Sequence, residues 1–319
     1  MTIVMIGRVI GIFTTMANFN LAACMIFRDE AHNLQEWVEY HMMIGVEHFF
    51  LYSHLSQDNY REVLQPYIKR RQVTLVEWNF PRRRFAPGGG RGPFPQVTAY
   101  DHALERLRGT AKWMMAIDSD EFLTKMSDLS ITDFLKRHEG AAAVLLNWAM
   151  FGTNGHKTRP EGLVLENYTK RGHKSFDKNH HVKTIIDPTR IKYSLDPHQW
   201  QLGCNELGET YKVVDEHGTP VTRETQTEPF LNLSGTPEVS WKYFRINHYA
   251  MRSEEEFKWK ISQRGRLSSG VRNDEWRDQH FKKQNRNDVE DTHMLKYVST
   301  LKRRIETQND VTPTWQEVH

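Results

Sequence analysis

Short apolar runs alternate with longer amphipathic segments in the first part of the chain. Each run has the length and apolar character of a strand buried on both faces. The segments between them carry apolar side chains at roughly helical spacing, and Gly45 stands where the first of them would end. This order of elements predicts a parallel sheet covered by helices. The predicted strands are residues 20–27, 48–53 and 73–78, and the predicted helices are residues 31–45 and 56–70.

The pattern is less regular in the rest of the chain. Residues 79–95 are rich in Pro, Gly and Arg, which predicts a mobile loop whose glycines permit closure over a ligand. Ser130 is suited to cap a helix that begins after it. The predicted strands here are 113–118, 141–152, 181–187 and 241–249, and the predicted helices are 96–109, 130–138 and, with many charges, 253–304.

These patterns divide the chain into an N-terminal segment (1–19), an α/β domain (20–250) and a basic helical C-terminal extension (251–319). The N-terminal segment is apolar, but Arg8 interrupts it. It is therefore too short for a spanning helix, which needs about 20 apolar residues. It has no clear cleavage site, and we expect either a leading strand or a segment that faces a membrane weakly.

The charge of the chain is close to balanced, with 43 basic and 40 acidic residues and a net charge of +3. A nucleic-acid-binding protein would show a basic stripe with a recognisable binding motif, so this class is disfavoured. Two basic clusters still stand out. They attract phosphates or form solvated faces, and their members are Arg82, Arg83, Arg84 and Arg91 in the first and Lys258, Lys260, Arg264 and Arg266 in the second.

Tryptophan and cysteine limit the alternatives further. The 9 Trp residues suit either a buried core or a cleft in which flat rings pack on sugar faces. The 2 Cys residues make neither a disulfide framework nor a CxxC metal pair, which favours a reducing compartment.

The clearest chemical signal is the segment IDSDEF at residues 117–122. A predicted strand delivers Asp118 and Asp120 to its carboxyl end, the edge of an open parallel sheet where ligands bind. Side chains two residues apart in an extended segment point to the same side. These two carboxylates suit one Mn²⁺ or Mg²⁺ ion that also takes waters and phosphate oxygens as ligands. An isolated DxD is more often a surface turn, so its position after a strand is what favours the metal site.

Residues 24–59, CMIFRDEAHNLQEWVEYHMMIGVEHFFLYSHLSQDN, resemble the opening of glycosyltransferase family 92 and related family 2-like enzymes. That opening has a basic residue, Asn and Glu, then a helix with Glu-Trp and Tyr-His, then Gly-Val and a strand. Asp29 stands here in place of the usual Asn. The resemblance continues in order to about residue 265, at Asp118–Phe122, Trp148, Phe151-Gly152, Gly155-His156, Asn247-His248-Tyr249 and SEEEFKWK (253–260).

The resemblance implies a GT-A fold, which is a Rossmann-like α/β domain with a mostly parallel central sheet, here followed by the helical extension. Residues 20–122 would then bind a nucleotide-sugar donor, and residues 123–250 would bind the acceptor. The donor contacts implied are Arg28, Asp29, Glu30, Asp58, Gln96, Tyr100, Asp118, Ser119 and Lys183. Without the resemblance, Arg28–Glu30 would be read as a solvated strand end with an acidic helix start.

His248 is the third metal ligand that the resemblance implies, beside Asp118 and Asp120. Imidazole suits Mn²⁺ less well than carboxylate does, and a hydrogen-bonded strand-end histidine is an equally good reading. The residues expected to contact the acceptor are Trp148, His156 and His198.

An inverting transfer needs a base within hydrogen-bond reach of the acceptor hydroxyl. The choices in the irregular part of the chain are Asp187, Asp196 and Glu206, and none differs from an ordinary loop acid. The identity of the base stays open among them.

The function predicted is therefore a metal-dependent glycosyltransferase. The resemblance implies a UDP-hexose donor such as UDP-galactose, transfer with inversion, and a glycan or glycolipid acceptor of the polysaccharide or lipopolysaccharide type. The alternatives are a non-catalytic nucleotide-sugar or glycan-binding module of the same fold, and a metal-dependent phosphotransferase or nuclease, which would need more carboxylates for two metals. We expect a cytoplasmic protein whose basic helices suit peripheral contact with an anionic inner membrane.

Overall fold

The structure is a computed structural model of the chain, and it describes residues 8–10, 19–79, 94–221, 235–263 and 274–310. The predicted loop at 79–95 and its proposed closure fall almost wholly outside the described residues. The same holds for Arg82, Arg83, Arg84, Arg91, Arg264 and Arg266 of the two basic clusters.

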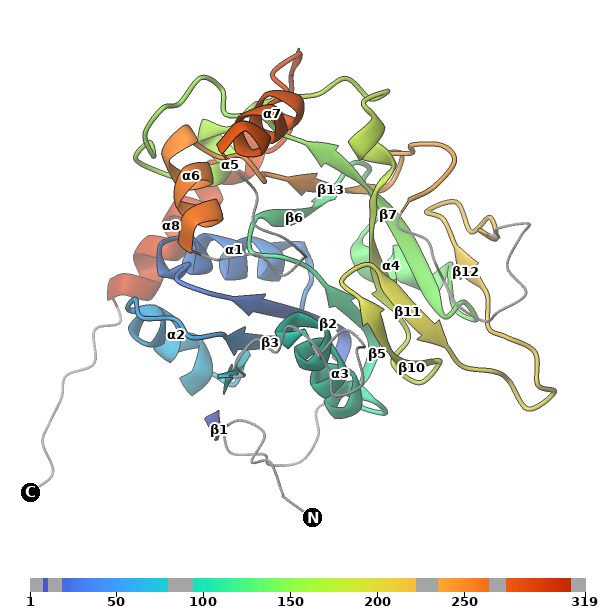
Figure 1. Cartoon of the computed structure of the whole chain (residues 1–319). Helices are drawn as coiled ribbons and strands as arrows, with labels where there is room; N and C mark the ends of the chain where they lie inside the picture. Colours follow the sequence, from blue (N-terminus) through green and yellow to red (C-terminus); the bar gives the residue numbers. More distant parts are fainter. Residues whose placement is uncertain (1–7, 11–18, 80–93, 222–234, 264–273, 311–319) are drawn as a thin grey trace, which may run out of the picture.

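A ten-stranded sheet forms the centre of the molecule, in the order β1-β4-β3-β2-β5-β9-β7-β13-β6 with β12 beside β7 (Figure 1). The parallel pairs are β2–β3, β3–β4, β2–β5, β7–β12 and β7–β13. The strands are β1 (Arg8–Ile10), β2 (Phe19–Phe27), β3 (His48–Ser53), β4 (Val73–Glu77), β5 (Ala111–Ala116), β6 (Glu121–Lys125), β7 (Ala143–Met150), β9 (Val182–Ile186), β12 (Val213–Val214) and β13 (Phe244–His248). The predicted α/β class with a mostly parallel central sheet is confirmed.

The helices flank this sheet, and the C-terminal region is helical as predicted. Gly45 ends the first helix in the left-handed conformation, with φ of 109°, and its N–H donates to the last turn. The Ser130 side chain accepts a hydrogen bond from the Asp133 N–H and caps α4. The helices are α1 (Ala31–Ile44), α2 (Tyr60–Lys69), α3 (Pro95–Leu107), α4 (Ile131–Lys136), α5 (Val164–Asn167), α6 (Glu254–Gln263), α7 (Asp274–Gln284) and α8 (Leu295–Asp310), with a 3₁₀ turn at Asp177–His180.

Short strands with few apolar residues are the elements that the hydrophobic pattern missed. They are β6 and β12 of the central sheet, and four strands outside it: β8 (Lys170–Arg171), β10 (Ile191–Asp196), β11 (Gln199–Leu202) and β14 (Val289–Glu290). A run this short, or one half exposed as in β10, gives no clear period. The region 253–304, predicted to be helical, is interrupted by β14 between α7 and α8. The expected leading strand is present as β1, which pairs antiparallel with β4.

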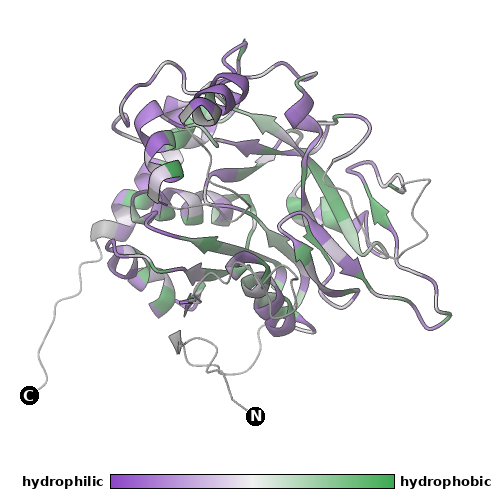
Figure 2. Cartoon of the chain, in the orientation of Figure 1, coloured by the Kyte–Doolittle hydropathy of each residue, from purple (hydrophilic) through white to green (hydrophobic). Residues whose placement is uncertain are grey.

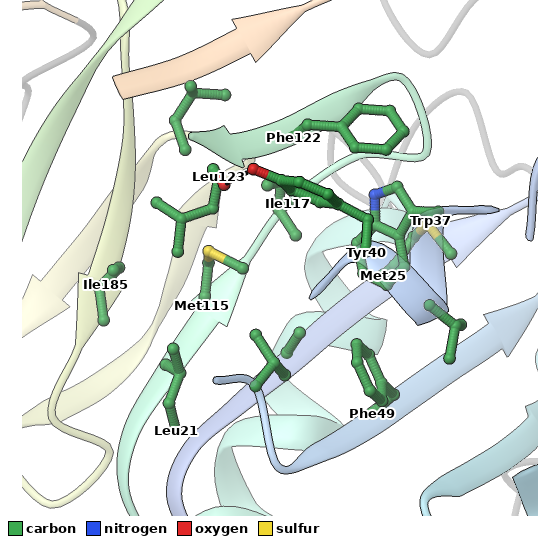
Figure 3. Packing of buried hydrophobic residues seen from close by; sticks show 14 of the residues in the cluster. Leu21, Met25, Trp37, Tyr40, Phe49, Met115, Ile117, Phe122, Leu123 and Ile185 are labelled. Atoms are coloured by element: carbon green, nitrogen blue, oxygen red, sulfur yellow. Dashed lines mark hydrogen bonds between the residues drawn. The ribbon is translucent and has the colours of Figure 1, made fainter. Parts of the chain in front are cut away.

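The main apolar core lies between α1 and the sheet (Figure 3). Two large side chains of α1 are fully buried there, and each also donates a hydrogen bond to β6. The Trp37 indole N–H donates to the Glu121 carbonyl at 2.9 Å, and the Tyr40 hydroxyl donates to the Leu123 carbonyl at 2.9 Å. Replacing a buried residue of this size by Ala typically costs about 3–5 kcal/mol. The same packing therefore stabilises the fold and fixes the strand that follows Asp118 and Asp120.

Hydropathy follows the layers, with apolar strands at the centre and polar helices α6 and α7 at the periphery (Figure 2). The C-terminal region is nevertheless joined to the sheet. The strand β14 pairs with β8, and Asp291 forms ion pairs with Arg171 at 2.6 Å and Arg245 at 2.8 Å. On α8, Arg304 pairs with the buried Glu39 of α1 at 2.7 Å. The predicted boundary between residues 250 and 251 stays a prediction.

The Asp291 ion pairs predict a measurable contribution to stability. Arg245 is only 1% exposed, so Asp291→Asn leaves a buried guanidinium without its carboxylate. We expect the free energy of unfolding in urea to fall by about 3–5 kcal/mol at pH 7. Glu290→Gln, at the exposed neighbouring position, is the control and is expected to change it by less than about 0.5 kcal/mol.

The same variant has a predicted pH dependence. Burial raises the pKa of Asp291, but Arg245 and Arg171 outweigh burial and hold the pKa below its ordinary value. A carboxyl of this kind stabilises the fold above its unfolded pKa and loses that effect as the pH falls. The difference in unfolding free energy between the wild type and Asp291→Asn should therefore shrink below about pH 4. A difference that stays constant down to acid unfolding would contradict the assignment.

Candidate functional site

The carboxyl ends of three neighbouring parallel strands carry the polar residues that the sequence singled out. Arg28–Glu30 follow β2, Asp58 follows β3, and Asp118–Asp120 follow β5. Because β2 pairs in parallel with both β3 and β5, these ends lie at one edge of the sheet (Figure 1). This is the edge at which ligands of open α/β sheets bind.

Asp118 lies at the centre of a hydrogen-bonded cluster. Its Oδ1 accepts from the Gln96 side chain at 2.8 Å and from the Tyr100 hydroxyl at 3.3 Å, both on α3. Its Oδ2 accepts from Lys183 Nζ of β9 at 2.8 Å. Burial raises the pKa of Asp118, but the Lys183 ammonium outweighs burial and keeps the pKa below its ordinary value. Asp118 is therefore an ionised carboxylate already surrounded by donors.

Asp120 is held by a different set of groups, which come from the C-terminal part of the chain. Its Oδ2 forms an ion pair with Lys260 Nζ of α6, and its Oδ1 lies 3.7 Å from His248 Nε2. Burial raises the pKa of Asp120, but Lys260, followed by His248 and Arg252, lowers it far below the ordinary value. Asp120 is thus also ionised, and its partners differ from those of Asp118.

The register of β6 and β13 explains why His248 reaches Asp120 and Glu121. These strands are antiparallel, and His248 pairs directly with Glu121. The Tyr249 N–H extends the ladder by donating to the Asp120 carbonyl at 2.8 Å. His248 Nδ1 lies 3.9 Å from Glu121 Oε1, and burial lowers the pKa of His248 to about 4. His248 is therefore neutral at pH 7 and can act as a ligand.

Glu121 is a third acid in this cluster that sequence reasoning did not single out. Its side chain is fully buried, and its Oε2 accepts from the Asp118 N–H at 2.9 Å and lies 3.2 Å from Lys183 Nζ. Burial raises the pKa of Glu121 to about 8, although Lys183 opposes this. The only sequence signal was its position directly after the DxD.

The first strand end is joined to the loop that contains Asp58. Asp29 Oδ1 accepts from the Gln57 N–H at 2.6 Å, and Asp58 Oδ2 accepts from the Ala31 N–H at 2.7 Å. Asp29 has φ of 52°, a left-handed conformation that Asp and Asn tolerate better than other side chains. The left-handed conformation explains why Asp29 can occupy the position at which the glycosyltransferases that this sequence resembles usually have Asn. Arg28 forms an ion pair with Asp29 at 3.5 Å.

Arg252 connects this strand end to the DxD segment, and it too was missed from the sequence. It is buried, and its guanidinium donates to Glu30 Oε2 at 3.0 Å and to the Ser119 carbonyl at 3.0 Å. Nothing in the local sequence before α6 indicated this contact across the fold.

A cavity of about 550 Å³ lies between these strand ends and α6. Trp259, which is 37% exposed, presents an aromatic ring in its wall, and it was not predicted as a site residue. The cavity is lined by Asp29, Glu30, His32, Asp58, Asp120, Arg159, Tyr249, Ala250, Met251, Arg252, Glu255, Glu256, Trp259 and Lys260. Its volume is in the range of sites that bind small molecules.

Two of the three predicted acceptor residues meet beside this cluster. Trp148 of β7 packs against His248 with ring centroids 4.3 Å apart and against His198 at 5.4 Å. His181 stacks on the same ring at 5.1 Å. His156 is placed separately, where its Nε2 lies 3.2 Å from the Asn167 carbonyl and its ring contacts Tyr168.

The three candidate bases lie in three different places. Asp196 Oδ1 accepts from the His198 N–H at 2.7 Å, which connects it to the Trp148 group. Asp187 lies beyond β9 and pairs with Arg190 at 3.2 Å, in the wall of a separate cavity. Because β9 runs antiparallel to β5, Lys183 and Asp187 lie toward opposite edges of the sheet. Glu206 is exposed in a turn after β11.

Among the described residues, no three His, Cys, Asp or Glu side chains gather into a complete metal site. Asp120 and the neutral His248 come nearest to one, because His248 Nε2 lies 3.7 Å from Asp120 Oδ1. A hard divalent cation needs only one or two protein carboxylates when waters and phosphate oxygens complete its shell. Within the described residues His248 Nδ1 is buried without a hydrogen-bond partner, while the ring itself packs against Trp148. The donors present therefore fit Mn²⁺ or Mg²⁺ bound together with a phosphate ligand.

Comparisons with known proteins identify the family. The model of glycosyltransferase family 92 matches residues 20–264 of this chain. A glycosyltransferase family 92 protein of Ricinus communis is 27% identical over 180 residues, which are 55% of this chain and 30% of that protein. A family 92 protein of Arabidopsis thaliana is 25% identical over 244 residues, 70% of this chain and 39% of that protein. The matched region is thus well under half the length of these relatives.

Solved structures give only distant likenesses. TarS of S. aureus has a TM-score of 0.37 and 10% identity, covering 83% of this chain and 70% of that one. The mannosyltransferase PcManGT of Pyrobaculum calidifontis, in complex with GDP-Man and Mn²⁺, has a TM-score of 0.29 and 14% identity over 41% of this chain and 37% of that one. These TM-scores are too low for either likeness to bear on the chemistry of this chain.

Lys183 is predicted to be essential for the stability of the site. It is 1% exposed and faces Asp118 and Glu121, so Lys183→Met leaves the fully buried Glu121 and the partly buried Asp118 without their cation. We expect the free energy of unfolding to fall by about 3–5 kcal/mol. Lys112→Met on β5 is the matched control, because its ion pair with Glu139 is solvent-exposed and should matter by less than about 1 kcal/mol. Equal losses of unfolding free energy in the two variants would show that the buried ion pairs of Lys183 stabilise the fold no more than the exposed pair of Lys112 does.

Proposed function

Because this chain belongs to glycosyltransferase family 92, we propose that it transfers a sugar from a nucleotide-sugar donor to an acceptor hydroxyl. The observation that carries the proposal is the convergence of Asp58, Asp120 and His248 on one edge of the sheet. Asp58 and Asp120 line the same cavity, and His248 lies against Asp120. The carboxylates of Asp29, Glu30 and Asp58 in the cavity wall can accept hydrogen bonds from a nucleoside. Asp120, Arg252 and Lys260 in the same wall suit a diphosphate with its cation.

The nucleoside would lie at the ends of β2 and β3. Asp58 Oδ1 is buried and has no hydrogen-bond partner in the part of the chain that the structure describes, although Asp58 Oδ2 is held by the Ala31 N–H. An unpaired buried carboxylate oxygen is costly, so a ligand N–H or hydroxyl that pairs with it gains affinity. Asp29 and Glu30 line the same part of the cavity, and Arg28 lies beside Asp29.

The diphosphate would lie at the DxD segment. A divalent cation held by Asp120 and His248, with Asp118 beside it, would neutralise the charge that develops on the leaving diphosphate. The protein's own part is to keep the site pre-organised. Lys183 and Gln96 hold Asp118 in place, and Arg252 holds the Ser119 carbonyl. Fixed donors of this kind cost no reorganisation during the reaction.

The acceptor would approach from the side of Trp148 and His198. We propose Asp196 as the base of an inverting transfer, ahead of Asp187 and Glu206, since Asp196 alone is joined to that group. The base must reach the acceptor hydroxyl directly or through one water. His156 is proposed as an outer acceptor contact.

The proposed donor is a UDP-hexose, with UDP-galactose as the first to test, and the proposed acceptor is a glycan or glycolipid. Synthesis of a polysaccharide or lipopolysaccharide at the cytoplasmic face of a membrane is the setting proposed. No helix within the described part of the chain has the length and apolar character needed to cross a bilayer. Peripheral contact would use the basic residues of the C-terminal helices.

A non-catalytic module of the same fold is the second candidate. Such a module does not need both aspartates and an adjacent neutral imidazole, and these are present here. The distinction is whether the bound nucleotide-sugar is turned over.

The first experiment measures nucleotide release from a panel of nucleotide-sugars with Mn²⁺ and after its removal by a chelator. We expect slow hydrolysis of one UDP-sugar only with metal, and a loss of at least about a hundredfold in Asp120→Asn, which removes a charge from the metal-binding pair. Asp128→Asn, at an exposed position that follows β6, is the control and should keep full activity. Metal-dependent binding without any turnover would favour the binding module, and no binding at all would reject the proposal.

A second experiment tests the nucleoside site. Asp58→Asn keeps one oxygen for the Ala31 N–H but places an amide where the unpaired oxygen was. We expect KM for the donor and Kd for UDP to rise about ten- to a hundredfold while kcat changes little. Unchanged KM with a lowered kcat would contradict this assignment.

A further inference from the structure

The two aspartates of the DxD segment are neutralised by lysines in very different settings. Lys183 of β9 is 1% exposed and bridges Asp118 and Glu121, so its departure would leave the fully buried Glu121 without a cation. Lys260 of α6 is 34% exposed, and Asp120 is its ion-pair partner among the described residues. Lys183 is therefore a fixed part of the site, whereas the partly exposed Lys260 can be replaced at Asp120 by another cation.

Lys260 also lies where its ammonium could contact a phosphate after leaving Asp120. Lys260 and Asp120 both line the cavity between the strand ends and α6, together with Arg252 and Arg159. A released ammonium would stay at the cavity wall, because its helix stays packed through the buried Phe257. Basic side chains at such a wall attract phosphate groups.

The balance of charge connects these two positions. Asp120 is already paired with Lys260, so a divalent cation that binds Asp120 has to displace the Lys260 ammonium. A nucleoside diphosphate is a polyanion, and in the cavity that Lys260 lines it could take up the displaced ammonium. Cation and diphosphate should therefore bind much better together than either does alone.

We propose that Lys260 is an exchangeable counter-ion that occupies Asp120 in the metal-free protein and moves to the diphosphate when a divalent cation binds. The proposal rests on the function proposed above, and it adds a positioning and coupling role for a residue of the C-terminal extension. Lys260 competes with the cation at Asp120 and then supplies a charge-assisted hydrogen bond to phosphate. It thus makes tight metal binding conditional on the presence of the donor.

The test measures Mn²⁺ binding directly, by the loss of the electron paramagnetic resonance signal of free Mn²⁺, without nucleotide. Lys260→Met removes the competitor, so we expect it to bind Mn²⁺ about tenfold more tightly than the wild type. Isothermal titration with UDP at saturating Mn²⁺ should show the opposite effect, a loss of about tenfold, because the phosphate contact is gone.

Two control variants make the result specific. Lys258→Met changes a lysine of the same helix that is 74% exposed and pairs only with Glu254, and it should match the wild type in both measurements. Lys260→Arg keeps a competing cation and should restore weak Mn²⁺ binding. Circular dichroism on all variants checks that the fold is retained.

Either of two results would overturn the proposal: Mn²⁺ affinity in Lys260→Met equal to or below that of the wild type, or UDP affinity that is unchanged. Absence of Mn²⁺ binding to both proteins also overturns it, since there is then no cation to exchange with. If the wild type binds Mn²⁺ but no nucleoside diphosphate, the proposed function fails separately, and the Mn²⁺ comparison still decides whether Lys260 is a competitor.

Discussion

The antiparallel pairing of β6 with β13 determines the chemistry available at this sheet edge. It sets His248 opposite Glu121 and brings the C-terminal part of the chain against Asp120, more than a hundred residues earlier. The strand β6 is itself held by Trp37 and Tyr40 of α1, whose hydrogen bonds anchor its backbone. Core packing and the position of the imidazole therefore depend on the same strand, and a slip of one residue would turn His248 to the other face.

Burial of charge is the second constraint, and it explains the unusual density of cations around the DxD. Ionised carboxylates that are removed from water need counter-ions. Lys183 supplies one from β9, Lys260 supplies another from α6, and Arg252 secures the intervening backbone. Neutral His248 and the raised pKa of Glu121 limit the remaining charge. Each aspartate of the DxD segment thus has a lysine partner, and one of these lysines, Lys260, is partly exposed.

The sequence predicted the parts of this structure that depend on local pattern. The strands β2 to β5 and the helices between them follow from apolar runs and from the cap Gly45, and α4 follows from the cap Ser130. It also placed Asp118 and Asp120 at the carboxyl edge of the sheet, while Asp58 was implied as a donor contact only by the family resemblance. It could not give the direction of β9, which brings Lys183 to the site and leaves Asp187 at the other end, nor the contacts of Arg252 and Lys260. Those depend on pairing and packing between segments far apart in the chain.

The central claim is that Asp120 and His248 together form a cation site that serves a nucleoside diphosphate. Its most direct test is a crystal structure of the protein with Mn²⁺ and UDP, with anomalous diffraction used to locate manganese. We expect an anomalous peak in contact with Asp120 and His248. The uridine should lie near Asp58, with the diphosphate between the uridine and the manganese. UDP bound without manganese at this position, or a manganese peak bound by other residues, would contradict it.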